Sequence, residues 1–223
     1  MAPEPRAPGG PARILIVDDH PVFRLGLVQM LGSEQGLAVC GEAESAEQAL
    51  ERIDELAPDL VVIDISLAGA SGLELVKRLR ERRPELPALV LSMYDETLFA
   101  GRSLRAGTRG YVNKQEPVEE MIAAVREVLA GGTYLSPRMR TRLEARTGAV
   151  AGELGAPAAC LSDRELEVFG LIGEGLRTRE IAERLGIAVK TVETYREHIK
   201  EKLGLKSGPE LARRAVAWML AQG

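Results

Sequence analysis

The segment RILIVDD, residues 13–19, is the strongest single indication of the fold. Its short apolar run is typical of a strand that is buried on both faces, and two aspartates follow the run directly. The segment LVVID, residues 60–64, repeats this pattern with a single aspartate at its end. Other short apolar runs predict three more strands, at residues 38–41, 88–92 and 110–112.

Amphipathic segments separate these strands and predict helices. The predicted helices cover residues 22–31, 46–56, 73–83, 98–106 and 118–130. Ser45 followed by Gln48 predicts a capping box at the start of the second helix. Five strand–helix repeats with apolar strands predict an α/β fold with a doubly wound, five-stranded parallel sheet. The carboxyl ends of the strands form the edge where such sheets bind ligands.

Charged and polar side chains gather at this predicted edge of the sheet. Asp18 and Asp19 follow the first strand, Asp64 ends the third, Ser92 ends the fourth and Lys114 follows the fifth. Clustered carboxylates repel one another unless a cation neutralises them. Mg²⁺ suits such a site because it prefers oxygen ligands and leaves positions for water and a phosphoryl group. We therefore predict that the three aspartates bind Mg²⁺.

The same edge has the groups that phosphoryl transfer needs. A carboxylate beside a metal ion can attack phosphorus and form an acyl phosphate. The Ser92 hydroxyl and the Lys114 ammonium can then bind the oxygens of the new phosphoryl group. Taken alone, each aspartate could be a turn or cap residue, and Ser92 and Lys114 could be ordinary loop residues. Their occurrence together, on strands in this order, favours the phosphoryl site.

Only helices are predicted after residue 160. Ser162 and Glu165 predict a capping box at about residue 162, and later helices are expected at residues 179–185, 189–203 and 209–221. Gly186 can adopt the left-handed conformation that a tight turn between helices needs. The expected buried residues are Ile181, Ala182, Leu185, Val192, Ile199 and Leu203. The spacing alone fits either a helix-turn-helix or a plain helical hairpin with solvated charges.

The motifs of both regions resemble the NarL/FixJ family of two-component response regulators. In the first region the similar segments are IVDDHPVFRLGL, VVIDISLAGASGLEL, LSMYDE and GYVNK; in the second, KTVETYREHIKEKLGL resembles the LuxR-type helix-turn-helix. The resemblance covers about residues 13–130 and 161–221. It implies a flavodoxin-like receiver domain that accepts a phosphoryl group, followed by an all-α domain that binds DNA.

The resemblance assigns a role to each receiver residue. It implies Mg²⁺ binding by Asp18 and Asp19, and phosphorylation of Asp64 by a sensor histidine kinase. Ser92 matches the family's hydroxyl residue and Tyr111 its switch aromatic, while Lys114 matches its lysine. His20 matches the family's DDHP run, and we interpret it as local structure and not as a metal ligand. Ala68 and Ala70 stand where the family commonly has proline and methionine. These departures bear on the rigidity of the loop after Asp64, and not on the phosphorylation site.

By the same resemblance, residues 189–203 are a recognition helix that lies in the major groove of DNA. Its expected contact residues are Lys190, Thr191, Glu193, Thr194, Arg196, Glu197 and Lys200. The basic residues and Thr191 are expected at phosphates or guanine edges, and Glu193 can accept a hydrogen bond from cytosine. Ala188 stands where a serine cap is common. The last helix resembles the family's dimerisation helix, and its apolar residues could instead close the small core.

Composition predicts four parts of the chain. We expect a disordered tail at residues 1–12, which are rich in Pro, Gly and Ala, and a receiver domain at 13–132. A linker is expected at 133–160, with a helix from Pro137 to about Arg146, and the DNA-binding domain at 161–223. That last part has 11 Lys and Arg against 10 Asp and Glu, so its net charge is +1, and the chain total of −4 leaves −5 before it. Such charge supports DNA binding only weakly.

These features predict a cytoplasmic transcription regulator that is not an enzyme. No apolar run approaches the ~18 residues of a membrane span, and Cys40 and Cys160 lack metal or redox spacing. The expected partners are a histidine kinase, promoter DNA, a second copy of the chain when phosphorylated or DNA-bound, and RNA polymerase as a further candidate. One alternative is an aspartate-dependent phosphatase, which Ser66 disfavours because a second acid is usual there. Another is a DNA-binding regulator that is never phosphorylated.

Overall fold

A computed structural model describes residues 10–67, 69, 71–94, 96–137, 139–140 and 160–220. The chain divides into two compact units, one within residues 1–141 and the other within 142–223, and each is described by itself. Most of the expected tail and linker lies outside the described residues. So does most of the helix expected from Pro137 to about Arg146, and so do Ala68 and Ala70.

The first unit contains the predicted parallel sheet. Its strands pair in the order β2-β1-β3-β4-β5, and every pair is parallel. The strands are β1 (Ala12–Val17), β2 (Leu37–Ala43), β3 (Leu60–Asp64), β4 (Ala88–Ser92) and β5 (Gly110–Asn113). Every residue of β3 and β4 is buried, as the uninterrupted apolar runs predict. The doubly wound α/β fold is therefore confirmed.

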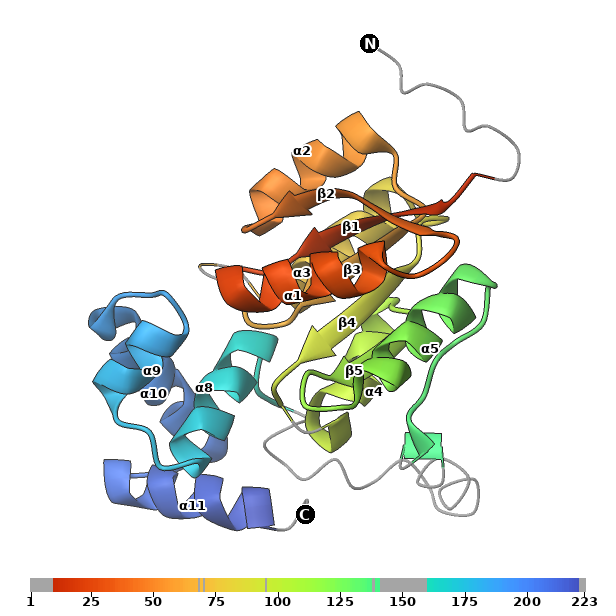
Figure 1. The fold of residues 1–223 in the computed structure, drawn as a ribbon. Coiled ribbons are helices and arrows are strands. Elements are labelled where there is room, and N and C mark those ends of the chain that lie inside the picture. Colours follow the sequence, from red (N-terminus) through yellow and green to blue (C-terminus); the bar gives the residue numbers. More distant parts are fainter. Residues whose placement is uncertain are drawn as a thin grey trace. The chain divides into compact units, whose positions relative to one another are not determined.

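Helices connect the strands and cover both faces of the sheet (Figure 1). They are α1 (Pro21–Gly32), α2 (Ala46–Leu56), α3 (Gly72–Arg82), α4 (Glu96–Ala106) and α5 (Val118–Leu129). Leu27 and Leu31 of α1 share a hydrophobic core with Val125 and Val128 of α5, on one face of the sheet. The predicted capping box of α2 forms in part. The Ser45 hydroxyl accepts from the Gln48 amide, but the Gln48 side chain bonds to the Glu44 amide instead of that of Ser45.

The first unit extends beyond the expected boundary at residue 132. Tyr134 is buried in the same core as α1 and α5, and its amide donates to the Arg109 carbonyl at 2.8 Å. Tyr134 also forms a bridge with Gly110, so the chain here lies along the β5 edge of the sheet. The start of the expected linker is therefore packed on the sheet. A lone aromatic residue after two glycines gives no periodic signal for such packing.

The second unit contains four helices among the described residues: α8 (Asp163–Gly173), α9 (Thr178–Arg184), α10 (Val189–Leu203) and α11 (Gly208–Leu220). The predicted capping box at Ser162 and Glu165 forms completely. The Trp218 ring of α11 packs on Phe169 of α8, with the ring centroids 5.3 Å apart. Leu211 and Ala215 are fully buried beside them. These residues therefore close the small core, which was one of the two roles considered for them.

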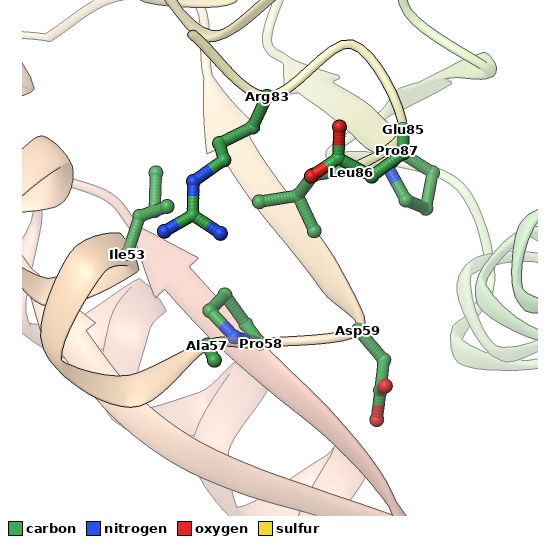
Figure 2. Close-up of a pocket in the computed structure, with 8 residues that line it drawn as sticks. All are labelled: Ile53, Ala57, Pro58, Asp59, Arg83, Glu85, Leu86 and Pro87. Atoms are coloured by element: carbon green, nitrogen blue, oxygen red, sulfur yellow. The ribbon is translucent and has the colours of Figure 1, made fainter. Parts of the chain in front are cut away.

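A surface pocket of about 230 Å³ lies at the amino ends of β3 and β4, away from the strand ends that carry the aspartates. Figure 2 shows its lining, which comes from Ile53 of α2 and from the loops before these two strands. Arg83 at its rim pairs with Asp54 at 3.2 Å. The pocket therefore lies apart from the predicted phosphoryl site. None of the helices in the described ranges is long and apolar enough to cross a membrane.

Candidate functional site

Lys114 connects two aspartates that end different strands. Its Nζ lies 2.7 Å from Asp18 Oδ2 and 2.7 Å from Asp64 Oδ2. The strands β1 and β3 are neighbours in the sheet, whereas Lys114 follows β5 at its edge, so the long side chain spans the distance. All three side chains are buried, and the Phe23 ring lies 4.4 Å from the ammonium. The structure thus brings these three predicted residues together.

Asp19 and His20 complete the cluster on its more exposed side. The Nδ1 atom of His20 lies 2.8 Å from Asp19 Oδ1 and 3.7 Å from Asp64 Oδ2. The His20 amide also donates to Asp18 Oδ1 at 2.8 Å. Our interpretation of His20 as local structure therefore missed its place in the pocket. Its position directly after the aspartate pair was the available signal.

The charges of the pocket set different protonation tendencies for its two buried aspartates. Burial and the nearby Asp64 carboxylate raise the pKa of Asp18, against the effect of Lys114. Burial also disfavours a charged Asp64, but the contacts with His20 and Lys114 outweigh it and hold the pKa of Asp64 below its ordinary value. The Asp64 carboxylate in turn raises the pKa of His20. Of the two buried carboxyl groups, Asp64 is therefore the one whose surroundings favour the ionised form.

Backbone contacts fix the two buried aspartates. Asp64 Oδ1 accepts from the Ser66 amide at 3.2 Å. The first residue of α3, Gly72, approaches β3 so closely that a Cβ there would lie 2.0 Å from the Asp64 carbonyl oxygen. Arg24 of α1 donates to the Asp18 carbonyl at 2.6 Å and pairs with Glu42 at 3.0 Å. These contacts hold the carboxylates in place, and only the aspartates were apparent from the sequence.

Ser92 and Tyr111 are connected through Tyr94. The Ser92 hydroxyl accepts from the Tyr94 amide at 3.0 Å, and the Tyr111 hydroxyl donates to the Tyr94 carbonyl at 2.6 Å. All three residues are buried, and the Tyr94 ring stacks on Phe99 with centroids 4.9 Å apart. Sequence analysis singled out Ser92 and Tyr111 but missed Tyr94. An aromatic residue just beyond a strand end has many other uses, so its signal is weak.

The donor atoms of this pocket suit a hard divalent cation. One ligand atom from each of Asp18, Asp19, His20 and Asp64 lies within 4.8 Å of the others. Mg²⁺ is bound in proteins by one or two carboxylates, with water or substrate oxygens in its other positions. Asp18, Asp19 and Asp64 offer carboxylate oxygens from which such a ligand set can be drawn. The imidazole is a poorer ligand for this ion because it is a nitrogen donor.

Most of the expected DNA-contact residues are exposed on α10 in the second unit. Lys190, Thr191, Glu193, Thr194 and Glu197 are exposed, whereas Arg196 and Lys200 are half-buried. The exposed face carries two ion pairs within the helix, Lys190–Glu193 at 3.1 Å and Lys200–Glu197 at 2.8 Å. Ala188 provides no side-chain cap for this helix. The helix therefore presents both charges and hydroxyl groups to a partner.

The turn between α9 and α10 has the predicted geometry. Gly186 adopts a left-handed φ of 60°, which favours glycine. Arg164 of α8 holds this region in place, because its guanidinium donates to the Leu185 carbonyl at 3.0 Å and pairs with buried Glu167 at 2.6 Å. Sequence analysis did not identify this buried ion pair. Charged residues three apart in a helix usually lie at the surface.

Comparison with known proteins gives the family. Residues 14–126 match the response regulator receiver domain, and residues 159–215 match the bacterial regulatory proteins of the luxR family. The oxygen regulatory protein NreC of Staphylococcus carnosus is 39% identical over 209 residues, which cover 92% of this chain and 96% of NreC. The chain belongs to the NarL/FixJ family of two-component response regulators. The response regulator GacA of Pseudomonas aeruginosa is 36% identical, with 92% of this chain and 95% of GacA covered.

Solved structures agree with this assignment. A LuxR-family response regulator from Aurantimonas sp. SI85-9A1 is 32% identical, with a TM-score of 0.59, and the match covers 62% of this chain and 99% of that one. RcsB from Salmonella enterica serovar Typhimurium, bound to the promoter rprA with the phosphomimetic BeF₃⁻, is 25% identical, with a TM-score of 0.60. That match covers 92% of this chain and 98% of RcsB. This response regulator therefore combines a receiver domain with a LuxR-type DNA-binding domain.

Proposed function

We propose that this response regulator accepts a phosphoryl group on Asp64 from a sensor histidine kinase and thereby controls its binding to promoter DNA. The observation that carries the proposal is the contact of Lys114 with both Asp18 and Asp64, at 2.7 Å each, beside Asp19. Three carboxylates and one ammonium at the carboxyl ends of a parallel sheet match the needs of a phospho-accepting site.

Asp64 acts as the nucleophile in this proposal. Its low pKa keeps the carboxylate ionised, so an oxygen can attack the phosphorus atom of a phosphohistidine while the bond to the imidazole nitrogen breaks. Asp18, Asp19 and Asp64 would hold Mg²⁺, which neutralises the carboxylates and the incoming phosphoryl oxygens. Lys114 then donates to a phosphoryl oxygen in place of its contact with Asp64.

Access to Asp64 requires a local rearrangement. Its side chain is only 2% exposed, and its Oδ2 atom accepts from Lys114 and lies 3.7 Å from His20. The His20 side chain is 54% exposed, so it can turn toward solvent at little cost. Its departure would open the side of the pocket where a cation and a phosphoryl donor enter.

Ser92 and Tyr111 transmit the new charge in this proposal. A phosphoryl group adds about −1.5 to −2 charges at one point. The Ser92 hydroxyl would turn toward its oxygens and give up the hydrogen bond from Tyr94. Tyr111 bonds to the same residue, so its position would change with that loop.

The second unit would bind DNA through α10. RcsB, a structural relative, is bound to a promoter in one of its structures, which supports the same mode here. Lys190, Thr191, Arg196 and Lys200 would contact phosphates or guanine edges. Thr194 and Glu197 would lie beside them, and Glu193 would accept from a cytosine amino group. A phosphorylated or DNA-bound homodimer in the cytoplasm, with RNA polymerase as a further partner, fits this function.

An aspartate-dependent phosphatase is the rival function, and the pocket disfavours it. Turnover usually needs a second carboxylic acid that protonates the leaving group. Ser66 occupies the position two residues after Asp64, and its amide donates to Asp64 Oδ1. We therefore propose that the protein is a phospho-acceptor and not an enzyme that hydrolyses small phosphoesters.

Incubation with acetyl phosphate and Mg²⁺ tests the proposal by intact-protein mass spectrometry. The wild-type chain should gain one phosphoryl group, and Asp64→Asn should gain none. Asp54→Asn is the matched control, because Asp54 lies on α2 and pairs with Arg83 at 3.2 Å, apart from the cluster around Asp64. Equal incorporation into the wild type and Asp64→Asn would show that the acceptor is another residue.

A further inference from the structure

The Phe23 ring lies over the Lys114 ammonium, with 4.4 Å between the Nζ atom and the ring centroid. The same Nζ atom lies 2.7 Å from an oxygen of Asp18 and 2.7 Å from an oxygen of Asp64. An ammonium group has three N–H donors, so contacts with two carboxylates do not exhaust it. The negative face of an aromatic ring attracts a cation within about 6 Å of its centroid. The ammonium is therefore held by three groups, two of them charged.

The start of α1 brings Phe23 to this position. The helix begins at Pro21, two residues after Asp19. Phe23, Leu27 and Leu31 lie four residues apart, so they share one face of the helix. Leu27 and Leu31 are buried in the core on the sheet, and half-buried Phe23 packs against the same core. The apolar face of α1 thus ends in a ring that reaches the ammonium in the pocket.

Arg24 fixes the first turn of α1, which carries the ring. Its guanidinium donates to the Asp18 carbonyl at 2.6 Å, to Glu42 at 3.0 Å and to Glu44 at 2.6 Å. The residue next to Phe23 is therefore tied to the chain at the carboxyl ends of β1 and β2. A ring on a helix that is fixed in this way keeps its place when other side chains of the pocket move.

We propose that Phe23 is a positioning residue for phosphoryl transfer, whose ring holds the Lys114 ammonium in the pocket while Lys114 moves from Asp64 to a phosphoryl oxygen. The inference rests on the proposed function, because it requires a phosphoryl group on Asp64. Phe23 offers neither an acid, a base nor a metal ligand, so it acts only through Lys114.

The ring matters more after the transfer than before it. Before the transfer, two buried carboxylates hold the ammonium whether or not the ring is present. Once Asp64 is phosphorylated, Lys114 gives up its contact with that carboxylate, and Asp18 and the ring remain. A ring face tolerates a small shift of the cation, because the attraction is not tied to one donor angle as a hydrogen bond is. Phe23 therefore favours the phosphorylated state over the free one.

The alternative is that Phe23 only completes the apolar core beside Leu27. Replacing ring hydrogens by fluorine separates the two roles. Fluorine withdraws electron density from the ring face, while the ring keeps its shape and its apolar character. A packing role predicts no change along such a series, whereas a cation–π contact predicts a stepwise loss.

Site-specific replacement of Phe23 by 4-fluoro- and 3,4,5-trifluorophenylalanine in the full chain tests the inference. Beryllofluoride with Mg²⁺ serves as the stable phosphoryl mimic on Asp64. Its affinity should fall with each step of fluorination, by about tenfold in all, the size expected of a cation–π contact away from water. The affinity for Mg²⁺ alone should stay the same, because neither Phe23 nor Lys114 is among the ligand groups of the cluster. The same replacement of Phe169, which packs on Trp218 in the second unit, is the matched control and should leave both affinities unchanged.

The NMR signals of the lysine ε-methylene groups report the contact itself. Protons above a ring face are shifted upfield, so the Lys114 signal should lie upfield in the wild type and stay there when beryllofluoride binds. Phe23→Leu removes the ring, so it should abolish the upfield shift and weaken beryllofluoride binding. Phe23→Tyr keeps a ring face and should behave as the wild type does. The fluorinated chains keep the test decisive if Phe23→Leu folds poorly.

Phosphoryl incorporation from acetyl phosphate, measured on the same samples, separates the two proposals. If Asp64 gains the phosphoryl group and the beryllofluoride affinity is constant along the fluorinated series, the inference is wrong and the proposed function stands. If Asp64 gains nothing, the proposed function fails and the inference fails with it. Loss of the upfield shift of Lys114 on adding beryllofluoride would also overturn the inference, since the ammonium would then leave the ring as it leaves Asp64.

Discussion

Lys114 offsets part of the negative charge of the receiver pocket. Its ammonium lies between two buried carboxylates, so it reduces a repulsion that would otherwise favour their protonation. Sequence analysis placed Lys114 at the correct edge of the sheet and assigned it to phosphoryl oxygens. The pairing with both aspartates depends on side-chain conformations in the folded pocket, which residue spacing cannot give.

Asp19 and His20 are adjacent residues with different expected effects on metal binding. Asp19→Asn removes a hard oxygen donor and should weaken Mg²⁺ binding about tenfold or more. His20→Ala removes a nitrogen donor that lies 2.8 Å from Asp19 and should leave Mg²⁺ affinity the same or slightly higher. Calorimetric titration of both variants measures this. The reverse order would mean that the imidazole, and not the carboxylate, is the ligand.

Among the helices, α8 shows how a capping motif contributes to tertiary structure. The Glu165 carboxylate accepts from the Ser162 amide at 2.7 Å and from Lys202 of α10 at 2.6 Å. The capping box could be predicted from Ser162 and Glu165 alone, because its spacing is local. The bond to Lys202 could not, since the two residues are 37 positions apart. The same carboxylate thus caps one helix and fastens another.

Glu165→Gln should destabilise the second unit by about 1–2 kcal/mol at neutral pH, since the amide keeps the cap but loses the charge. Burial disfavours the charge of Glu165, but Lys202 and Ser162 outweigh it and hold its pKa below 4.5. The charge therefore stabilises the folded state above pH 4.5, and this contribution disappears as pH falls through the lower folded pKa.

Urea unfolding at pH 7 and at acid pH measures this difference. The difference in free energy of unfolding between the wild type and Glu165→Gln should be smaller at acid pH. Glu183→Gln, at an exposed residue that lies 3.8 Å from Arg179, should change little at either pH. A gap that widened in acid would contradict the assigned direction of the pKa shift.

If α10 docks on DNA as proposed, variants of this helix should separate affinity from base preference. Lys200→Ala should weaken binding to all sequences about equally and reduce the salt slope by about one unit. Glu193→Ala should change the preference among bases and also release Lys190, its partner at 3.1 Å, for a phosphate. Binding of both variants to a target and to mutated sites, at two salt concentrations, measures this. Lys77→Ala on α3 is the control for the loss of one positive charge. If Lys200→Ala alone changed the base preference, α10 would lie in the groove in a different rotation about its own axis.

Across the two units, sequence patterns predicted the repeated strands and helices and missed individual long-range contacts. The apolar runs predicted the strands of the sheet, and the aspartates at their ends predicted which edge carries the charged residues. The helical periodicity after residue 160 predicted the all-α second unit. The packing of Tyr134 on β5 was missed, as was the contact of Ser136 with Glu96, because neither has a periodic pattern. The Tyr94 connection was missed for the same reason. Such single long-range contacts depend on the completed fold.

If phosphorylation of Asp64 controls the second unit, the affinity of the protein for DNA must depend on phosphorylation. A duplex selected from a random pool by the wild-type protein is titrated at one fixed salt concentration, with and without acetyl phosphate and Mg²⁺. We expect phosphorylation to tighten binding about fivefold or more, the usual range of allosteric coupling, and Asp64→Asn to show no response. Unchanged affinity of a wild-type sample whose Asp64 is demonstrably phosphorylated would contradict the account.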